Sequence, residues 1–159
     1  MAAGVAGVPG DYAANIGTTG ADYTLHSALG DIPSNGAFQR FKGLRSKDFI
    51  DGLSNTIQVG EKHVPFNAFA KFPWDCGIFD GHNPVCNTRC GGPGFPIART
   101  RDDLGWNFGS YHPGICQFGF CDGSVHALSS SIDDVVLGLL VQRAMTASKL
   151  RSTKAKSAN

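Results

Sequence analysis

Cysteine and histidine side chains gather between residues 76 and 90, where they could bind a metal ion or form a disulfide. Cys76, His82, Cys86 and Cys90 supply the thiolate and imidazole ligands that structural zinc prefers. Their spacing, C-x5-H-x3-C-x3-C, is not a common zinc pattern, so we favour a disulfide or thiols over zinc. In an oxidising compartment we expect one bond among Cys76, Cys86 and Cys90, and the sequence leaves all three pairings open.

The other two cysteines, Cys116 and Cys121, lie on one predicted strand and point to opposite faces of it. They should not bond to each other, because a disulfide needs its Cβ atoms about 4 Å apart. Since the chain has five cysteines, one thiol must stay unpaired within the monomer, and Cys116 is our candidate for a buried thiol.

His112 and Asp122 could form an acid/base or metal-binding pair. The predicted strand between them spans roughly 20 Å at about 3.3 Å per residue, so we expect the two side chains at opposite ends of a hairpin. Glu61 and His63 point to one side of another predicted strand, which fits half of a metal site or a solvated edge. The sequence has no nucleophile elbow, zinc-protease helix, phosphate-binding loop or dinucleotide fingerprint, so we name no catalytic residue and expect no enzyme.

The hairpin that holds these residues is predicted by Asp122-Gly123, which lies between two short runs of alternating side chains. A two-residue turn would pair Cys121 with Ser124 and Phe120 with Val125. Counting outward from that turn predicts one shared apolar face, made of Phe118, Phe120, Val125 and Ala127.

The remaining elements are read from periodicity and turn residues. We predict short strands at residues 12–16 and 23–25, a helical turn at 46–51 capped by Ser46, and a strand at 55–61. Residues 64–74 fit an edge strand at most, because they contain two prolines. We interpret residues 75–105 as a long surface excursion, and the acids after Ser129 predict a helix over 132–147.

Two blocks of sequence carry a family resemblance. One block begins at His112-Pro113-Gly114 and ends at Asp122-Gly123, with nine residues between His112 and Asp122. It resembles the C-terminal H-X9-DG signature of a large planctomycete-type family of unknown function. The segment Asp51-Gly52-Leu53-Ser54-Asn55-Thr56-Ile57-Gln58-Val59-Gly60-Glu61 is similar to that family's DGxSNTIxxGE block. Residues 12–18 and 35–38 resemble its weaker upstream elements. We treat these residues as a structural motif.

The resemblance implies an α+β fold: an antiparallel β-sheet with long loops and a C-terminal helix, forming a pilin-like or pseudopilin-like head. Family members usually begin with a long apolar, prepilin-type helix, which is missing from the first ten residues here, and no run of 18 apolar residues occurs. The resemblance places the chain in the cell envelope, periplasmic or extracellular, with membrane contact only through the missing helix. Asp75, Asp80, Asn83 and Asp102 or Asp103 could surround a calcium ion in the loop, as the resemblance to pilin-like secretion subunits implies. The alternative is that these acids are solvated, as scattered loop acids usually are; no EF-hand pattern is present, and we expect no cofactor.

Composition bounds the architecture. With 159 residues, 21 glycines and 17% charged residues, the chain fits one β-rich, loop-rich domain. We expect that domain over 11–147, a flexible N-terminus over 1–10 and a flexible basic tail over 148–159. A formal charge of +1 argues against a nucleic-acid partner.

Three functions from different classes follow. We favour a non-catalytic structural or assembly subunit that associates with itself or with other pilin-like subunits and needs no cofactor. The second is a ligand- or glycan-binding module that uses Trp74, Trp106, Tyr111 and Phe95. The third is a metal-dependent enzyme built on His112, Asp122, Glu61 or His63.

Overall fold

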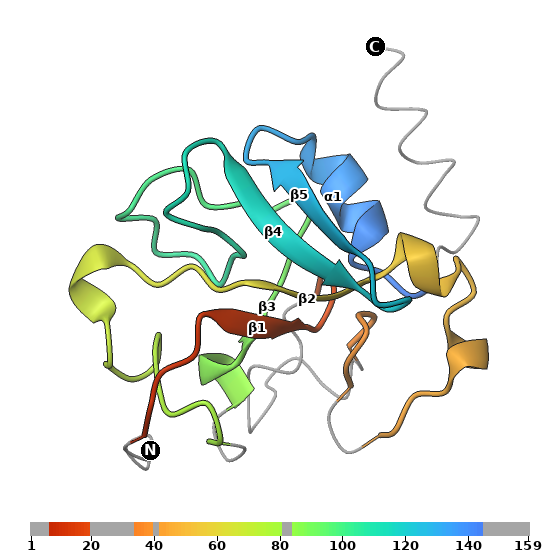
Figure 1. The fold of residues 1–159 in the computed structure, drawn as a ribbon, viewed down its shortest axis with the longest axis horizontal. Coiled ribbons are helices and arrows are strands. Elements are labelled where there is room, and N and C mark those ends of the chain that lie inside the picture. Colours follow the sequence, from red (N-terminus) through yellow and green to blue (C-terminus); the bar gives the residue numbers. More distant parts are fainter. Residues whose placement is uncertain (1–6, 20–33, 40–41, 81–83, 145–159) are drawn as a thin grey trace.

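A five-stranded sheet organises the part of the chain that the computed structural model describes, residues 7–19, 34–39, 42–80 and 84–144 (Figure 1). The strands lie in the order β3-β1-β2-β4-β5, and one α-helix, α1, follows them. Their bounds are β1 Tyr12–Asn15, β2 Ile57–Glu61, β3 Thr88–Arg89, β4 Ile115–Phe120, β5 Val125–Ser129 and α1 Asp134–Leu140. The α+β class is confirmed. The sheet is mixed, however, because β3 runs parallel to β1 while every other pair is antiparallel.

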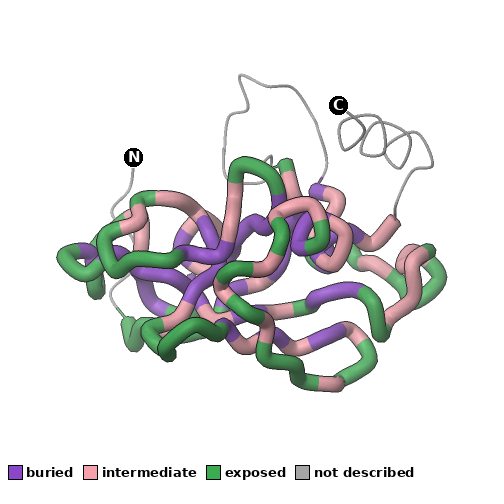
Figure 2. The backbone as a smooth tube through the Cα atoms, turned by 90° about the horizontal axis from the view of Figure 1, so that it is seen from above, coloured by how far each residue is buried: buried purple, intermediate pink, exposed green. Residues whose placement is uncertain are grey.

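One face of this sheet forms the hydrophobic core. Phe118 of β4 packs edge-to-face on Phe108, with ring centroids 5.3 Å apart, and Leu137 and Val141 complete the cluster from the C-terminal region. The buried stretches run through the middle of the molecule, and exposed loops surround them (Figure 2). Cys116 is fully buried on the same face, as expected for the buried thiol.

The β4–β5 hairpin reverses where expected, but its register differs by one residue from the prediction. Gly119 pairs with Val125 and Phe118 with His126, so the turn has three residues, Cys121 to Gly123, and not two. Gly123 has φ +90°, and its N–H donates to Phe120 O at 3.0 Å. A type I turn followed by a left-handed glycine gives this geometry and competes with the two-residue turn.

This one-residue difference moves β5 to the other face. The predicted shared face of Phe118, Phe120, Val125 and Ala127 is therefore wrong for its β5 half. The two phenylalanines are buried, whereas Val125 and Ala127 are exposed on the opposite face.

Helix α1 is shorter than predicted. Asp133 is its N-cap, and the Asp133 carboxylate accepts hydrogen bonds from Val135 N and Val136 N at 2.8 and 3.2 Å. Beyond Leu140 the backbone leaves the helix: Arg143 N donates to Asn35 O at 3.0 Å, and Val141 O accepts the Asn15 side-chain amide at 2.8 Å. Residues 145–147 of the predicted helix lie outside the described residues.

Several segment predictions need correction. Residues 64–74 contain a 3-10 turn, Phe66–Ala68, and no strand, since Pro65 and Pro73 interrupt the run. Residues 75–105 are not wholly a surface excursion: they supply the 3-10 turn Pro84–Cys86, the strand β3 and the fully buried Arg89.

Earlier in the chain, the predicted turn at 46–51 shortens to a 3-10 turn, Ser46–Asp48, whose N-cap is Arg45 and not Ser46. A further 3-10 turn, Leu53–Asn55, delays the start of β2 to Ile57. The strand predicted at 12–16 is confirmed as β1, and the strand predicted at 23–25 lies outside the described residues.

Candidate functional site

The two motif blocks meet in space at Glu61 and His112. Glu61 ends β2, and its Oε1 lies 3.4 Å from His112 Nε2, while its Oε2 accepts the Gln117 backbone N–H at 2.6 Å. Glu61 is nearly buried, with 13% of its side chain exposed, and His112 is 58% exposed. The carboxylate thus joins the end of β2 to β4 and also orients the imidazole.

Asp122 performs a different task at the opposite end of β4. Its Oδ1 accepts Ser124 Oγ at 2.7 Å and Ser124 N at 2.9 Å, and these bonds, led by the one from the hydroxyl, lower the pKa of the carboxyl. Since β4 covers six residues, about 20 Å of strand separates Asp122 from His112. Aspartate is common in turns because its short side chain can accept a hydrogen bond from the backbone two residues on, as Asp122 does from Ser124.

The rest of the first block builds a compact turn before β2. Gly52 has φ +93°, Asn55 Nδ2 donates to Asp51 O at 2.9 Å, and Thr56 Oγ1 donates to Gly52 O at 3.0 Å. Ser54 is exposed. Gly60, within β2, leaves room for the core, because a Cβ there would lie 2.5 Å from the Phe118 ring.

In the second block, Pro113 and Gly114 connect His112 to β4. Gly114 has φ +73°, and its carbonyl accepts the Ser130 N–H at 2.9 Å, which extends the β4–β5 ladder by one pair. Both residues are exposed, and their contribution is to the path of the backbone.

A cleft of about 550 Å³ opens beside the Glu61–His112 contact. Three aromatic side chains line it, Tyr12, Phe69 and Tyr111, and each is 44–58% exposed. Tyr111 is held in place because its hydroxyl donates to Val64 O at 2.8 Å. The volume falls in the range of small-molecule sites, and the lining combines aromatic faces with a carboxylate and an imidazole.

A buried ion pair closes the back of this cleft. Lys62 Nζ lies 2.7 Å from Asp75 Oδ1, and Asp75 Oδ2 accepts the Ala70 N–H at 2.9 Å. Burial lowers the pKa of Lys62, and the contact with Asp75 opposes that effect. Asp75, which belongs to the predicted calcium-binding set, has its two carboxylate oxygens engaged by Lys62 and by the Ala70 N–H. Asn83 of that set lies outside the described residues.

His63 also lines the cleft but turns a ring nitrogen away into the fold. His63 Nε2 lies 2.9 Å from Asp103 O, and burial lowers the pKa of the imidazole. The side chain is buried, so the alternative of a solvated edge is wrong for His63, and the imidazole packs inside the fold.

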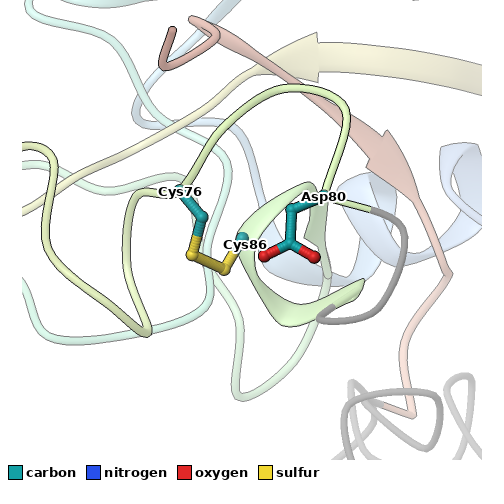
Figure 3. Close-up of side chains that lie close together, drawn as sticks. All are labelled: Cys76, Asp80 and Cys86. Atoms are coloured by element: carbon teal, nitrogen blue, oxygen red, sulfur yellow. A yellow bond between two sulfur atoms is a disulfide. The ribbon is translucent and has the colours of Figure 1, made fainter. Parts of the chain in front are cut away.

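The predicted disulfide forms between Cys76 and Cys86, whose Cα atoms are 5.4 Å apart, and Asp80 lies beside it (Figure 3). Among the residues described, this trio is the one group of at least three His, Cys, Asp or Glu side chains whose ligand atoms lie within 4.8 Å of one another. The bond consumes two of the four predicted zinc thiolate or imidazole ligands, so the oxidised protein does not have that site. His82 lies outside the described residues.

The other three cysteines are not disulfide-bonded. Cys90 and Cys116 are buried, and burial raises the pKa of the Cys116 thiol. Burial likewise raises the pKa of the half-buried Cys121 to about 11. Neither Cys116 nor Cys121 has the lowered pKa that a reactive cysteine needs.

The predicted aromatic residues do not gather at one site. Trp74 stacks on Trp106 with ring centroids 4.2 Å apart, and Arg89 lies 5.7 Å from the centroid of Trp106. Of the four aromatics named from the sequence, Tyr111 alone lines the cleft, while Tyr12 and Phe69 were missed. Tyr12 was detectable, since it alternates with the buried Ala13 on a predicted strand.

Part of the chain is similar to a protein family whose function is unknown. A family model described as "Protein of unknown function (DUF1559)" matches residues 80–135, about a third of the chain. The matched residues include the β4–β5 hairpin with His112 and Asp122, and they do not include the block at residues 51–61. No curated protein and no solved structure matches the chain. Within the described residues, no helix has the length and apolar character needed to cross a membrane.

Proposed function

We propose that this chain is a non-catalytic structural or assembly subunit, the globular head of a pilin-like or pseudopilin-like protein of the cell envelope or its secretion machinery. The observation that carries the proposal is how the motif carboxylates are used. Glu61 and Asp122 both accept hydrogen bonds from the chain's own backbone, at Gln117 N and Ser124 N. Motif residues engaged in this way specify a fold, and they need no cofactor to do so.

An enzymatic role would require a different arrangement. A general acid or base must reach its substrate proton while a second group orients it. Here Glu61 is committed to the sheet through Oε2, and Asp122 is committed to its turn at the far end of β4. Among the described residues, Glu61 is the one ionic partner of His112, and because the imidazole is 58% exposed we interpret this pair as a surface contact that holds the motif together.

The redox state supports a location outside the cytoplasm. The Cys76–Cys86 disulfide indicates an oxidising environment, because cytosolic thiols are normally kept reduced. The envelope assignment rests on this bond together with the resemblance of the two motif blocks to prepilin-type proteins.

The test uses the cells that make the chain naturally. Thiols are blocked with a maleimide before lysis, the cells are fractionated, and Cys76 and Cys86 are mapped by mass spectrometry. We expect an intact Cys76–Cys86 bond in the envelope fraction, and in-cell cross-links to the chain itself or to pilin-like subunits. A reduced pair in a cytoplasmic fraction would overturn the proposal.

Glycan binding is the second candidate, and the cleft favours it. Tyr12, which is 58% exposed, and Tyr111, which is 44% exposed and has Arg101 over its ring at 5.3 Å, line the cleft together with the Glu61 carboxylate. Aromatic rings with a carboxylate suit the apolar face and hydroxyl groups of a sugar. The assay is a glycan array followed by calorimetry. Tyr12→Ala should abolish binding, and Phe79→Ala is the matched control, since Phe79 is 96% exposed and does not line the cleft. Equal loss in both variants, or no binding by the parent chain, would refute this function.

A further inference from the structure

Strand β5 lies at the edge of the sheet and lacks the charged residues and prolines that usually prevent edge pairing. Among the described residues, β4 is its only partner strand. The sequence Val125-His126-Ala127-Leu128-Ser129 has no proline, lysine or acid, and Val125 is 68% exposed. Natural sheets usually protect their edges with charges, prolines or bulges, because an open edge binds another strand.

The hairpin register shows which backbone groups are available at that edge. Phe120 N donates to Ser124 O at 2.8 Å, and Ser130 N donates to Gly114 O at 2.9 Å. In an antiparallel pair the hydrogen-bonded residues alternate, so Ser124, His126 and Leu128 turn their backbone groups toward β4. The N–H and C=O groups of Val125 and Ala127 then point away from the sheet, and the described chain gives them no partner there.

These outward groups are self-complementary. Val125 and Ala127 lie one residue on either side of His126. In an antiparallel pairing of two copies about a two-fold axis through His126, Val125 of each copy faces Ala127 of the other. The N–H and C=O groups of Val125 and Ala127, four on each edge, are then satisfied, which is the isologous geometry of a symmetric dimer.

We propose that a second copy of this chain binds at this edge, β5 against β5, and joins the two five-stranded sheets into one. The inference rests on the proposed assembly function and names its surface and partner. Val125 and Ala127, both exposed in the single chain, become cross-strand neighbours on one face. The two His126 side chains oppose each other directly on the other face.

A register-specific cross-link tests this geometry. The directly opposed residues of a non-hydrogen-bonded antiparallel pair have Cα atoms about 4.5 Å apart, within reach of a disulfide. His126→Cys in the full chain should therefore form a covalent dimer under mild oxidation. Ser129→Cys is the matched control on the same strand: in the proposed register its sulfur lies roughly 20 Å from its counterpart and should not link.

The second arm measures association without a cross-link. Light scattering after size exclusion should show the parent chain shifting from monomer to dimer mass as its concentration rises. Ala127→Pro removes an outward N–H and should keep the chain monomeric, with cooperative unfolding intact because that N–H makes no bond to β4. Ala127→Ser retains the N–H and should dimerise like the parent.

Three results would overturn the edge pairing: a monomer at every concentration, equal linking at positions 126 and 129, or a dimer that survives Ala127→Pro. If Ala127→Pro fails to unfold cooperatively, the cross-link comparison decides alone. A negative outcome here leaves the envelope location open, because the thiol-mapping experiment tests that separately.

Discussion

Replacement of Glu61 tests whether the motif stabilises the fold or takes part in catalysis. Glu61→Ala removes two contacts at once, the 2.6 Å bond from Gln117 N and the 3.4 Å contact with His112. A structural role predicts that the first contact carries most of the free energy of unfolding. A catalytic role predicts instead that the contact between Glu61 and the His112 imidazole has the larger coupling energy.

The expected magnitudes follow from exposure. A hydrogen bond to a charged group contributes about 1.5–3 kcal/mol, and the carboxylate is nearly buried, so that bond keeps most of its strength. The contact with His112 is worth at most about 1 kcal/mol, because the imidazole is 58% exposed and solvent screens it. Glu61→Ala should therefore lower the unfolding free energy by about 2–3 kcal/mol and the melting temperature by roughly 5–10 °C.

Urea denaturation of a small variant set measures this. Glu61→Gln keeps an oxygen acceptor for Gln117 N and should cost less than half as much as Glu61→Ala. His112→Ala should cost under about 1 kcal/mol, and Gln117→Ala, which keeps its backbone N–H, is the control. The reasoning fails if His112→Ala costs as much as Glu61→Ala, or if a double-mutant cycle gives a coupling above about 2 kcal/mol.

Three further changes probe the cleft and the core. Asp75→Asn should cost about 3–5 kcal/mol in urea, because it leaves the Lys62 ammonium buried without a counterion, and Lys62→Met in the same chain should restore part of the loss. Burial lowers the pKa of His63 below 6.5, so the unfolded chain binds the proton first and thermal stability should fall as the pH drops below 6.5; His63→Gln should flatten that slope. Gly60→Ala should cost about 1–3 kcal/mol in chemical unfolding, because its methyl group meets the Phe118 ring, and an unchanged midpoint would contradict the packing argument.

Local signals predicted the hairpin well because turn chemistry acts over a few residues. Asp122-Gly123 located the reversal, and the alternation of Cys116, Phe118 and Phe120 gave the buried face of β4 correctly. The choice between a two-residue and a three-residue turn was the weak point. Both turns accept Asp-Gly, and a difference of one residue exchanges the faces of β5 completely.

The buried residues of the segment after Asp75 could not be predicted from the sequence, because their burial depends on hydrogen-bond partners that are distant in the chain. Arg89 is fully buried, and its guanidinium donates to His63 O at 2.9 Å and to Trp74 O at 3.0 Å. A charged residue in a Gly-rich, Pro-rich run is usually exposed, and nothing local marks those carbonyls as its acceptors. The Lys62–Asp75 pair was missed for the same reason, since its members belong to different segments.

The sequence distance between the motif blocks now has a physical explanation. Asp51 to Glu61 forms a turn and strand β2, and His112 to Gly123 forms the neighbouring strand β4 with its own turn. Each block therefore needs the other as its partner strand. The β2–β4 ladder joins the two blocks, and Glu61 extends the contact because its carboxylate replaces a backbone acceptor for Gln117 where the ladder ends. A side chain at position 61 must reach the Gln117 N–H and accept its hydrogen bond. The negative charge of Glu61 adds only the extra strength of a charge-assisted hydrogen bond. The same fold leaves the outer edge of β5 without a partner strand among the described residues, and this is the edge at which we propose that one second copy binds.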